Sequence, residues 1–103
     1  MIKVSIFYPN SQESKFNLDY YLAHHIPMLK KQLEPEGLKG VEIEEGIGTP
    51  KPGSPAPFSV VEHLVFNNYE EMQMALGTHS DMLMADVANF TNTEPFVQIN
   101  RVI

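Results

Sequence analysis

Four stretches of the chain have the hydrophobic and polar pattern of β-strands, and two regions between them have the pattern of helices. The predicted strands cover residues 2–8, 41–47, 58–66 and 96–103. The first two alternate hydrophobic and polar side chains, which is typical of strands with one buried face. The last two are largely apolar at both sets of alternating positions, which predicts that both of their faces are covered.

The first helical region follows the first strand. Hydrophobic residues, Leu22 among them, recur every three or four positions from Leu18 to Leu33, which predicts an amphipathic helix. Asn17 is the candidate N-cap of this helix. Pro27 lies inside the pattern and has no N–H with which to continue the helical hydrogen bonding. We therefore expect the helix to kink or to restart at Pro27.

The second half of the chain repeats the strand–helix–strand order after a proline-rich connection. Residues 49–57 contain four of the chain's eight prolines and are predicted to form a stiff loop. After the third strand, Asn68 is a candidate cap for a second helical region. This region is predicted to break near Gly77 and to resume over residues 80–88.

The order of these elements predicts an α+β fold, a ferredoxin-like βαββαβ sandwich. Right-handed crossovers place the first and third strands at the centre of a four-stranded antiparallel sheet, with the helices on one face. If the third and fourth strands are apolar on both faces, the face without helices exposes roughly several hundred Å² of apolar surface. A second copy packed sheet to sheet would cover it, so a homodimer is predicted.

Length, charge and cysteine content narrow the classes of function. The 103 residues suit one domain, 1–103, and the net charge of −6 argues against a nucleic-acid partner. No stretch approaches the roughly 20 apolar residues that span a bilayer, so no membrane association is expected and the cytoplasm is the predicted location. The absence of cysteine excludes disulfides, zinc–thiolate sites and thiol nucleophiles.

Several motifs, in the same order over essentially the whole chain, resemble those of the EthD family. They are Asp19-Tyr20-Tyr21 with His25-Ile26-Pro27, the loop ending Pro55-Ala56-Pro57, His63-Leu64-Val65-Phe66, and the tail from Asp86 to Ile99. The resemblance implies a dimeric α+β barrel, in which two ferredoxin-like subunits close their sheets into one barrel.

The resemblance implies less about function. The family takes its name from a gene cluster for ethyl tert-butyl ether degradation, in which the EthD component accompanies an oxygenase system in an undefined role. Some relatives act as dehydratases, decarboxylases or cyclases on aromatic polyketide-like compounds. The wider superfamily contains cofactor-free monooxygenases and haem-degrading enzymes, so the function has to be argued from a site.

His25 is the first candidate catalytic residue. It lies on the apolar stripe of the first helical region, one turn after Tyr21, and a histidine there can exchange protons with a ligand. Tyr21 and the nearby Met28 are candidate binding residues. The alternative is a buried histidine that only packs and forms hydrogen bonds beside Pro27.

His63 is the second candidate catalytic residue, in the otherwise apolar third strand. It faces either the helices or the barrel lumen. Tyr8 or Gln98 on the flanking strands could form a hydrogen bond with it, and both are candidate binding residues. The neighbouring Glu62 faces the opposite side. A buried Glu62 would have a raised pKa and could act as a general acid, with a salt bridge at the sheet edge or dimer interface as the alternative.

No metal or cofactor site is predicted, because the four histidines lack the spacings of metal-binding motifs. Asp86 is assigned a turn or capping role. The first functional hypothesis is an enzyme, a cofactor-free oxidoreductase or lyase, that acts on a small apolar or aromatic molecule with His25 and His63 in its pocket. The second is a non-catalytic binding or accessory module that partners an oxygenase system. A third hypothesis is that the helices and the sheet enclose no pocket. Haem ligation by His25 or His63 would be a special case of the enzyme hypothesis.

Overall fold

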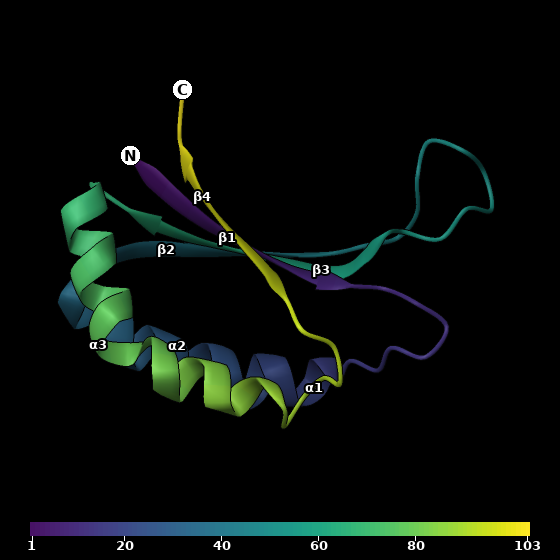
Figure 1. The fold of residues 1–103 in the computed structure, drawn as a ribbon, viewed down its shortest axis with the longest axis horizontal. Coiled ribbons are helices and arrows are strands. Elements are labelled where there is room, and N and C mark those ends of the chain that lie inside the picture. The colour runs from purple at the N-terminus through teal and green to yellow at the C-terminus, as the bar shows by residue number, and fades with distance from the viewer.

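The computed structural model describes residues 1–103 and shows a sheet with helices on one face (Figure 1). The sheet has the order β2-β3-β1-β4, and every neighbouring pair is antiparallel. Its strands are β1 (Ile2–Pro9), β2 (Leu38–Glu45), β3 (Phe58–Phe66) and β4 (Phe96–Arg101). The predicted ferredoxin-like sandwich, with the first and third strands at its centre, is confirmed.

The first helical region consists of four consecutive pieces. Asn17 caps it as predicted, because its side-chain oxygen accepts a hydrogen bond of 3.0 Å from the backbone N–H of Tyr20. Gly37 ends it with a left-handed φ of 111°, which glycine adopts without strain. The pieces are α1 (Leu18–Tyr20), the π-helical turn η1 (Tyr21–His25), α2 (Ile26–Leu33) and the 3₁₀ turn η2 (Glu34–Glu36).

The irregularity expected at Pro27 is observed as the wide π-helical turn η1. The backbone N–H of Ile26 bonds to the carbonyl of Tyr21, five residues earlier, just before the proline. The extra residue in this turn rotates the helix face. As a result, Tyr21 and His25 are buried, whereas Leu22 is 48% exposed. The prediction that Leu22 lies on the buried stripe is therefore wrong.

The second helix, α3 (Tyr69–Val87), is continuous over 19 residues, so the break predicted near Gly77 is wrong. A glycine inside a helix costs only about 1 kcal/mol relative to alanine, and buried Met72 and Leu83 hold the helix on either side of it. Asn68 caps α3 by accepting a hydrogen bond of 2.9 Å from the N–H of Glu71. Neither α3 nor any shorter helix combines the length and hydrophobicity needed to cross a bilayer.

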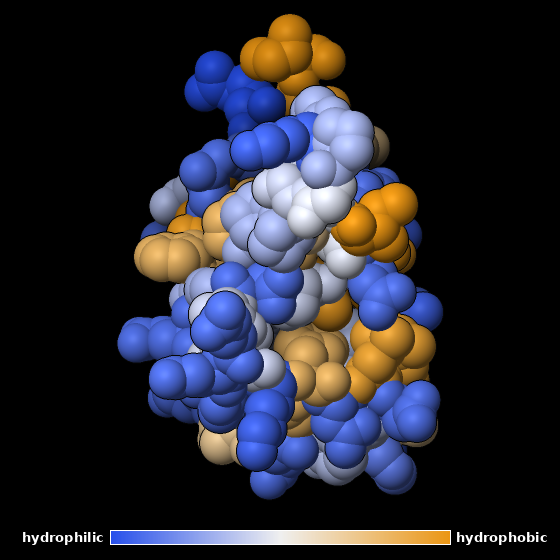
Figure 2. Space-filling view, turned by 90° about the vertical axis from the view of Figure 1, so that its right-hand side faces the viewer, coloured by the Kyte–Doolittle hydropathy of each residue, from blue (hydrophilic) through white to orange (hydrophobic).

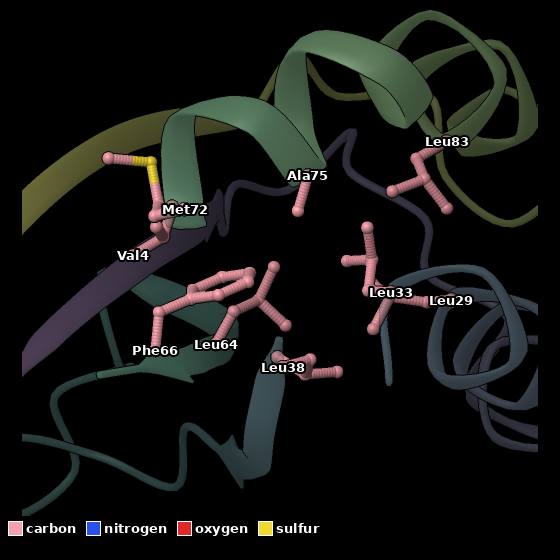
Figure 3. Packing of buried hydrophobic residues seen from close by; sticks show 9 residues of the cluster. All are labelled: Val4, Leu29, Leu33, Leu38, Leu64, Phe66, Met72, Ala75 and Leu83. Carbon is pink, nitrogen blue, oxygen red and sulfur yellow. The ribbon is translucent and has the colours of Figure 1, made fainter. Parts of the chain in front are cut away.

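The core between helices and sheet has two hydrophobic clusters. In the first, Phe66 and Leu64 of β3 face Leu33 of α2, as Figure 3 shows from close by. The second cluster is more aromatic and lies nearer the wide turn. It consists of Tyr8, Tyr21, Ile26, Val60, Val87 and Phe90.

The sheet face without helices is more polar than predicted. A row of hydrogen bonds joins side chains from all four strands, and its distances are between 2.6 and 3.0 Å. In order across the sheet, the row contains Glu44, His63, Ser5, Asn100 and Gln98. The expectation of a largely apolar face is therefore wrong at its centre.

Exposed apolar side chains gather on the edge strand β4 instead. Phe96, Val97 and Ile99 are 64%, 54% and 48% exposed. Since no strand pairs with the outer side of β4, its backbone edge remains open. An open apolar edge strand is the kind of surface that proteins usually cover.

Candidate functional site

A cavity of about 340 Å³ lies between the helices and the sheet. Hydrophobic side chains from β1, β3, β4, α2 and α3 make up ten of its 13 lining residues. The three polar ones are His25, Glu62 and Ser80. A mostly apolar cavity with few convergent polar groups is typical of small-molecule sites. The alternative in which helices and sheet enclose no pocket is therefore wrong.

His25 is 3% exposed and is held by a carboxylate and two rings. Its Nδ1 lies 2.8 Å from Oδ2 of Asp86. The imidazole stacks on the Tyr21 ring at 5.6 Å and 16°, and Phe90 contacts it at 4.7 Å. Because an ionised carboxylate can only accept, Nδ1 carries the proton, and Nε2 is the nitrogen left to act on a ligand.

Asp86 accepts three hydrogen bonds at the end of α3. Besides His25, the hydroxyl of Tyr20 donates at 2.8 Å and the side-chain amide of Asn89 at 2.9 Å. Burial alone would raise the pKa of Asp86, but the hydrogen bonds from Asn89, His25 and Tyr20 hold it below its usual range. The same contact raises the pKa of Tyr20. Asp86 is therefore an anion that orients His25, in addition to the predicted turn role, in which its backbone carbonyl accepts a hydrogen bond from the N–H of Asn89.

Glu62 is the second ionisable group of the cavity wall, 1% exposed on the helix side of β3. The Tyr21 hydroxyl donates to its Oε1 at 2.5 Å. Burial raises the pKa of Glu62, and the hydrogen bond from Tyr21 and the nearby His25 and His63 offset only part of this rise. Glu62 is thus suited to carry a proton at a pH where an exposed glutamate would not.

Four of the six predicted site residues lie on the helix side of the sheet. His25 and Tyr8 line the cavity. Tyr21 lies behind the wall and holds Glu62. Met28 packs against the first hydrophobic cluster and does not line the cavity. Burial raises the pKa of the Tyr8 hydroxyl, and electrostatic repulsion by the Glu62 carboxylate raises it further, so the hydroxyl stays protonated.

His63 and Gln98 lie on the other face of the sheet. Both ring nitrogens of His63 are engaged, Nδ1 by Ser5 at 2.8 Å and Nε2 by Glu44 at 3.0 Å. Successive residues of a strand point to opposite faces, so Glu62 and His63 cannot share a cavity. The hypothesis that His63 joins His25 in one pocket is wrong, and its bonded nitrogens do not suit it as a haem ligand.

Sequence reasoning missed Asp86 and placed Glu62 only conditionally. Glu62 had a usable signal, because it stands alone among Val60 and Leu64 on the same strand face. Asp86 had none, since 61 positions separate it from His25. No group of three or more His, Cys, Asp or Glu side chains is arranged to hold a metal ion.

The structure is similar to several solved structures over nearly its whole length. An EthD-like protein from Ralstonia eutropha is 28% identical with a TM-score of 0.92, covering 99% of this chain and 91% of that one. An EthD family protein from Bacillus halodurans is 17% identical with a TM-score of 0.71, covering 100% and 99%. The resemblance to EthD-like proteins inferred from the motifs is thereby confirmed.

More distant similarity shows only the fold. A cofactor-independent oxygenase from Streptomyces nogalater is 10% identical with a TM-score of 0.57, and the match covers 99% of this chain and 93% of that one. No family model and no curated protein matches the sequence.

Proposed function

With an EthD-like fold as the premise, we propose that this chain binds a small, mostly apolar organic molecule in its cavity and moves a proton to or from it. The observation that carries this proposal is the Asp86–His25 pair, whose imidazole lines a hydrophobic cavity. Exchange of one proton near neutral pH is the chemistry for which an oriented imidazole is suited.

His25 acts as the base through Nε2. Asp86 keeps the proton on Nδ1 and stabilises the imidazolium that forms when Nε2 accepts a second proton. The stacked Tyr21 ring and Phe90 fix the plane of the imidazole, so the lone pair of Nε2 has a constant direction. A base held in this way needs no rearrangement during the transfer.

Glu62 acts as the proton donor to a ligand oxygen. Its raised pKa favours the neutral carboxyl group, which suits donation to a carbonyl or hydroxyl group. The apolar lining disfavours charged ligands, because a charge transferred there loses its hydration. We therefore expect a neutral ligand with an acidic C–H or O–H beside an oxygen. Lyase reactions and cofactor-free oxidations can both begin with removal of such a proton.

The working unit we propose is a homodimer in the cytoplasm with its sheets facing each other. Support comes from the barrel architecture that the EthD resemblance implies and from Phe96 of β4, which is exposed and lies opposite Phe7 on the sheet face without helices. The absence of cysteine suits a reducing compartment.

A non-catalytic carrier or accessory module is the second candidate function. It is favoured by the predominance of hydrophobic lining residues, which suffice to hold an apolar ligand. Under this alternative, the Asp86–His25 pair contributes only to packing and to hydrogen bonding.

Hydrogen–deuterium exchange distinguishes the two functions. We expect the protein to accelerate exchange of the acidic C–H protons of α-tetralone, a neutral aryl ketone, as followed by NMR in deuterated buffer. His25→Gln should lower this acceleration by about 10²-fold, the usual contribution of a general base. His24→Gln, one residue away and exposed, is the matched control. Saturable binding of α-tetralone without exchange would favour the carrier instead.

A further inference from the structure

The connection between β2 and β3, residues Gly46–Pro57, forms a stiff projection that we call the proline arm. Figure 1 shows it extending past the end of the sheet and rising on the side opposite the helices. Its base is fixed, because the backbone N–H of Asn10 bonds to Pro57 O and its side-chain amide to Ala56 O, both at 2.9 Å. Beyond the base, Ile47 is 96% exposed.

The cavity opens at the edge of the sheet that is farthest from β2. Met84 and Val97 both line the cavity and are 48% and 54% exposed, so they mark its mouth. A second, shallower hollow of about 370 Å³ adjoins it, shares Met84 and Val87, and continues over residues 91–95. Nothing within a single chain covers the apolar rim at Met84 and Val97.

Strand directions place the arm and the mouth at the same end of the sheet. β2 and β4 are the two edge strands, and every neighbouring pair is antiparallel. It follows that β2 ends where β4 begins. The proline arm leaves the sheet after β2, and Val97 is the second residue of β4. Figure 2 looks onto this end and shows hydrophobic patches set among hydrophilic side chains.

A sheet-to-sheet dimer brings the arm of one chain to the mouth of the other. A two-fold axis parallel to the strands lays the β2 edge of one copy over the β4 edge of its partner and keeps the same ends together. Packed sheets lie about 10 Å apart. Half of the twelve-residue arm can span up to about 20 Å when extended, so it has the length to cross this gap.

The charges on the two surfaces are complementary. Lys51 is the only charged residue of the proline arm. Glu94 lines the second hollow, is exposed, and forms no ion pair within the chain. A cation on one surface and an anion on the other give the contact a specific register.

We propose that the proline arm of each subunit closes the cavity mouth of its partner, with Lys51 against Glu94 and Ile47 on the apolar rim. The complete binding site then needs two chains, one for the acid–base groups and one for the cover. This inference rests on the proposed homodimer and on the cavity as the ligand site.

The absence of cysteine permits a clean cross-linking test. A mixture of the Lys51→Cys chain and the Glu94→Cys chain should form a disulfide-linked heterodimer on mild oxidation, visible by non-reducing electrophoresis, because Cα atoms within about 7 Å can be bridged. A mixture of Lys51→Cys with Glu70→Cys, exposed on α3, is the control and should not cross-link. A dimer by sedimentation that fails to cross-link would overturn the arm contact and leave the proton-transfer proposal intact.

Charge reversal tests the contact in the intact protein. Lys51→Glu and Glu94→Lys should each weaken binding of α-tetralone by about two- to fivefold, as expected for loss of one exposed ion pair. The double reversal should restore it. Lys31→Glu, an exposed change of the same charge on α2, should leave binding unchanged. Equal weakening by the double reversal would contradict the pairing, and a monomer by sedimentation would remove its basis, while the His25→Gln exchange result tests the chemistry separately.

Discussion

Asp86 occupies a position that is unfavourable for the helix alone. It lies in the last turn of α3, where the carbonyl ends of the helix repel negative charge. Three hydrogen bonds from Tyr20, Asn89 and His25 compensate for this repulsion. A carboxylate kept at such a position points to a requirement for its contact with the imidazole rather than to a capping role.

Replacing Asp86 by Asn tests this orienting role. Asparagine keeps the size of the side chain but removes the charge that fixes the proton on Nδ1 of His25. We expect the exchange rate of α-tetralone to fall by about 10²-fold while the protein stays folded. The Nδ1 proton signal of His25 in NMR spectra should move or vanish. Unchanged exchange with an altered signal would show that the imidazole works without its carboxylate.

Contacts between single residues were the hardest features to predict from sequence. His25 could be found because it stands on an apolar helical stripe, and Glu62 could be suspected because it stands among valine and leucine. Nothing local links His25 to Asp86, which follows in the second half of the chain. The face of His63 depended on strand register, since a shift of one residue exchanges the two faces.

At the scale of elements, the two helical regions departed from the predictions in opposite ways. Pro27 did produce an irregularity, but as a wide turn that adds a residue before the proline. Gly77 produced none, since burial on both sides of it outweighs its low helical propensity. Local propensity predicted where a helix was weak, and tertiary packing decided whether it broke.

Gly77→Ala should therefore stabilise the protein. A Cβ at this position would meet nothing within 4 Å, and alanine loses less backbone entropy in a helix. We expect a gain of about 0.5–1 kcal/mol in the free energy of unfolding, measured by urea denaturation. Gly37→Ala is the matched contrast and should destabilise, because its φ is 111° and a Cβ would lie 2.8 Å from Oε2 of Glu71. No gain from Gly77→Ala would mean that α3 is strained there.

At the scale of the whole molecule, the order and pairing of strands followed from the sequence. Hydrophobic patterns, alternating in the first two strands and continuous in the last two, located all four strands, and β3 (Phe58–Phe66) has the predicted bounds. What the pattern could not give was the character of the open sheet face. His63 and Asn100 interrupt apolar strands, and only the pairing of β1 with its two neighbours shows that their side chains meet at Ser5.

Glu62 makes the stability of the whole fold depend on pH. Its pKa is raised in the folded protein, so the unfolded chain loses this proton first as pH rises above about 4.3. Stability associated with Glu62 is thus complete below that pH and declines as pH rises toward the folded pKa. Glu62→Gln should flatten this decline, measured by urea denaturation as the pH rises above about 4.3. The exposed Glu45→Gln is the control, and an unflattened curve for Glu62→Gln would show that burial of this carboxyl is inexpensive.

The row of hydrogen-bonded side chains from Glu44 to Gln98 also helps to fix the register of the strands in the sheet. Its links cross β2, β3, β1 and β4 in turn, and each requires a particular residue opposite another. If β4 slid by a single position, Asn100 would turn toward the helices and Ser5 would lose its amide donor. These polar side chains therefore disfavour strand pairings in the wrong register, which burial of hydrophobic side chains alone would not distinguish.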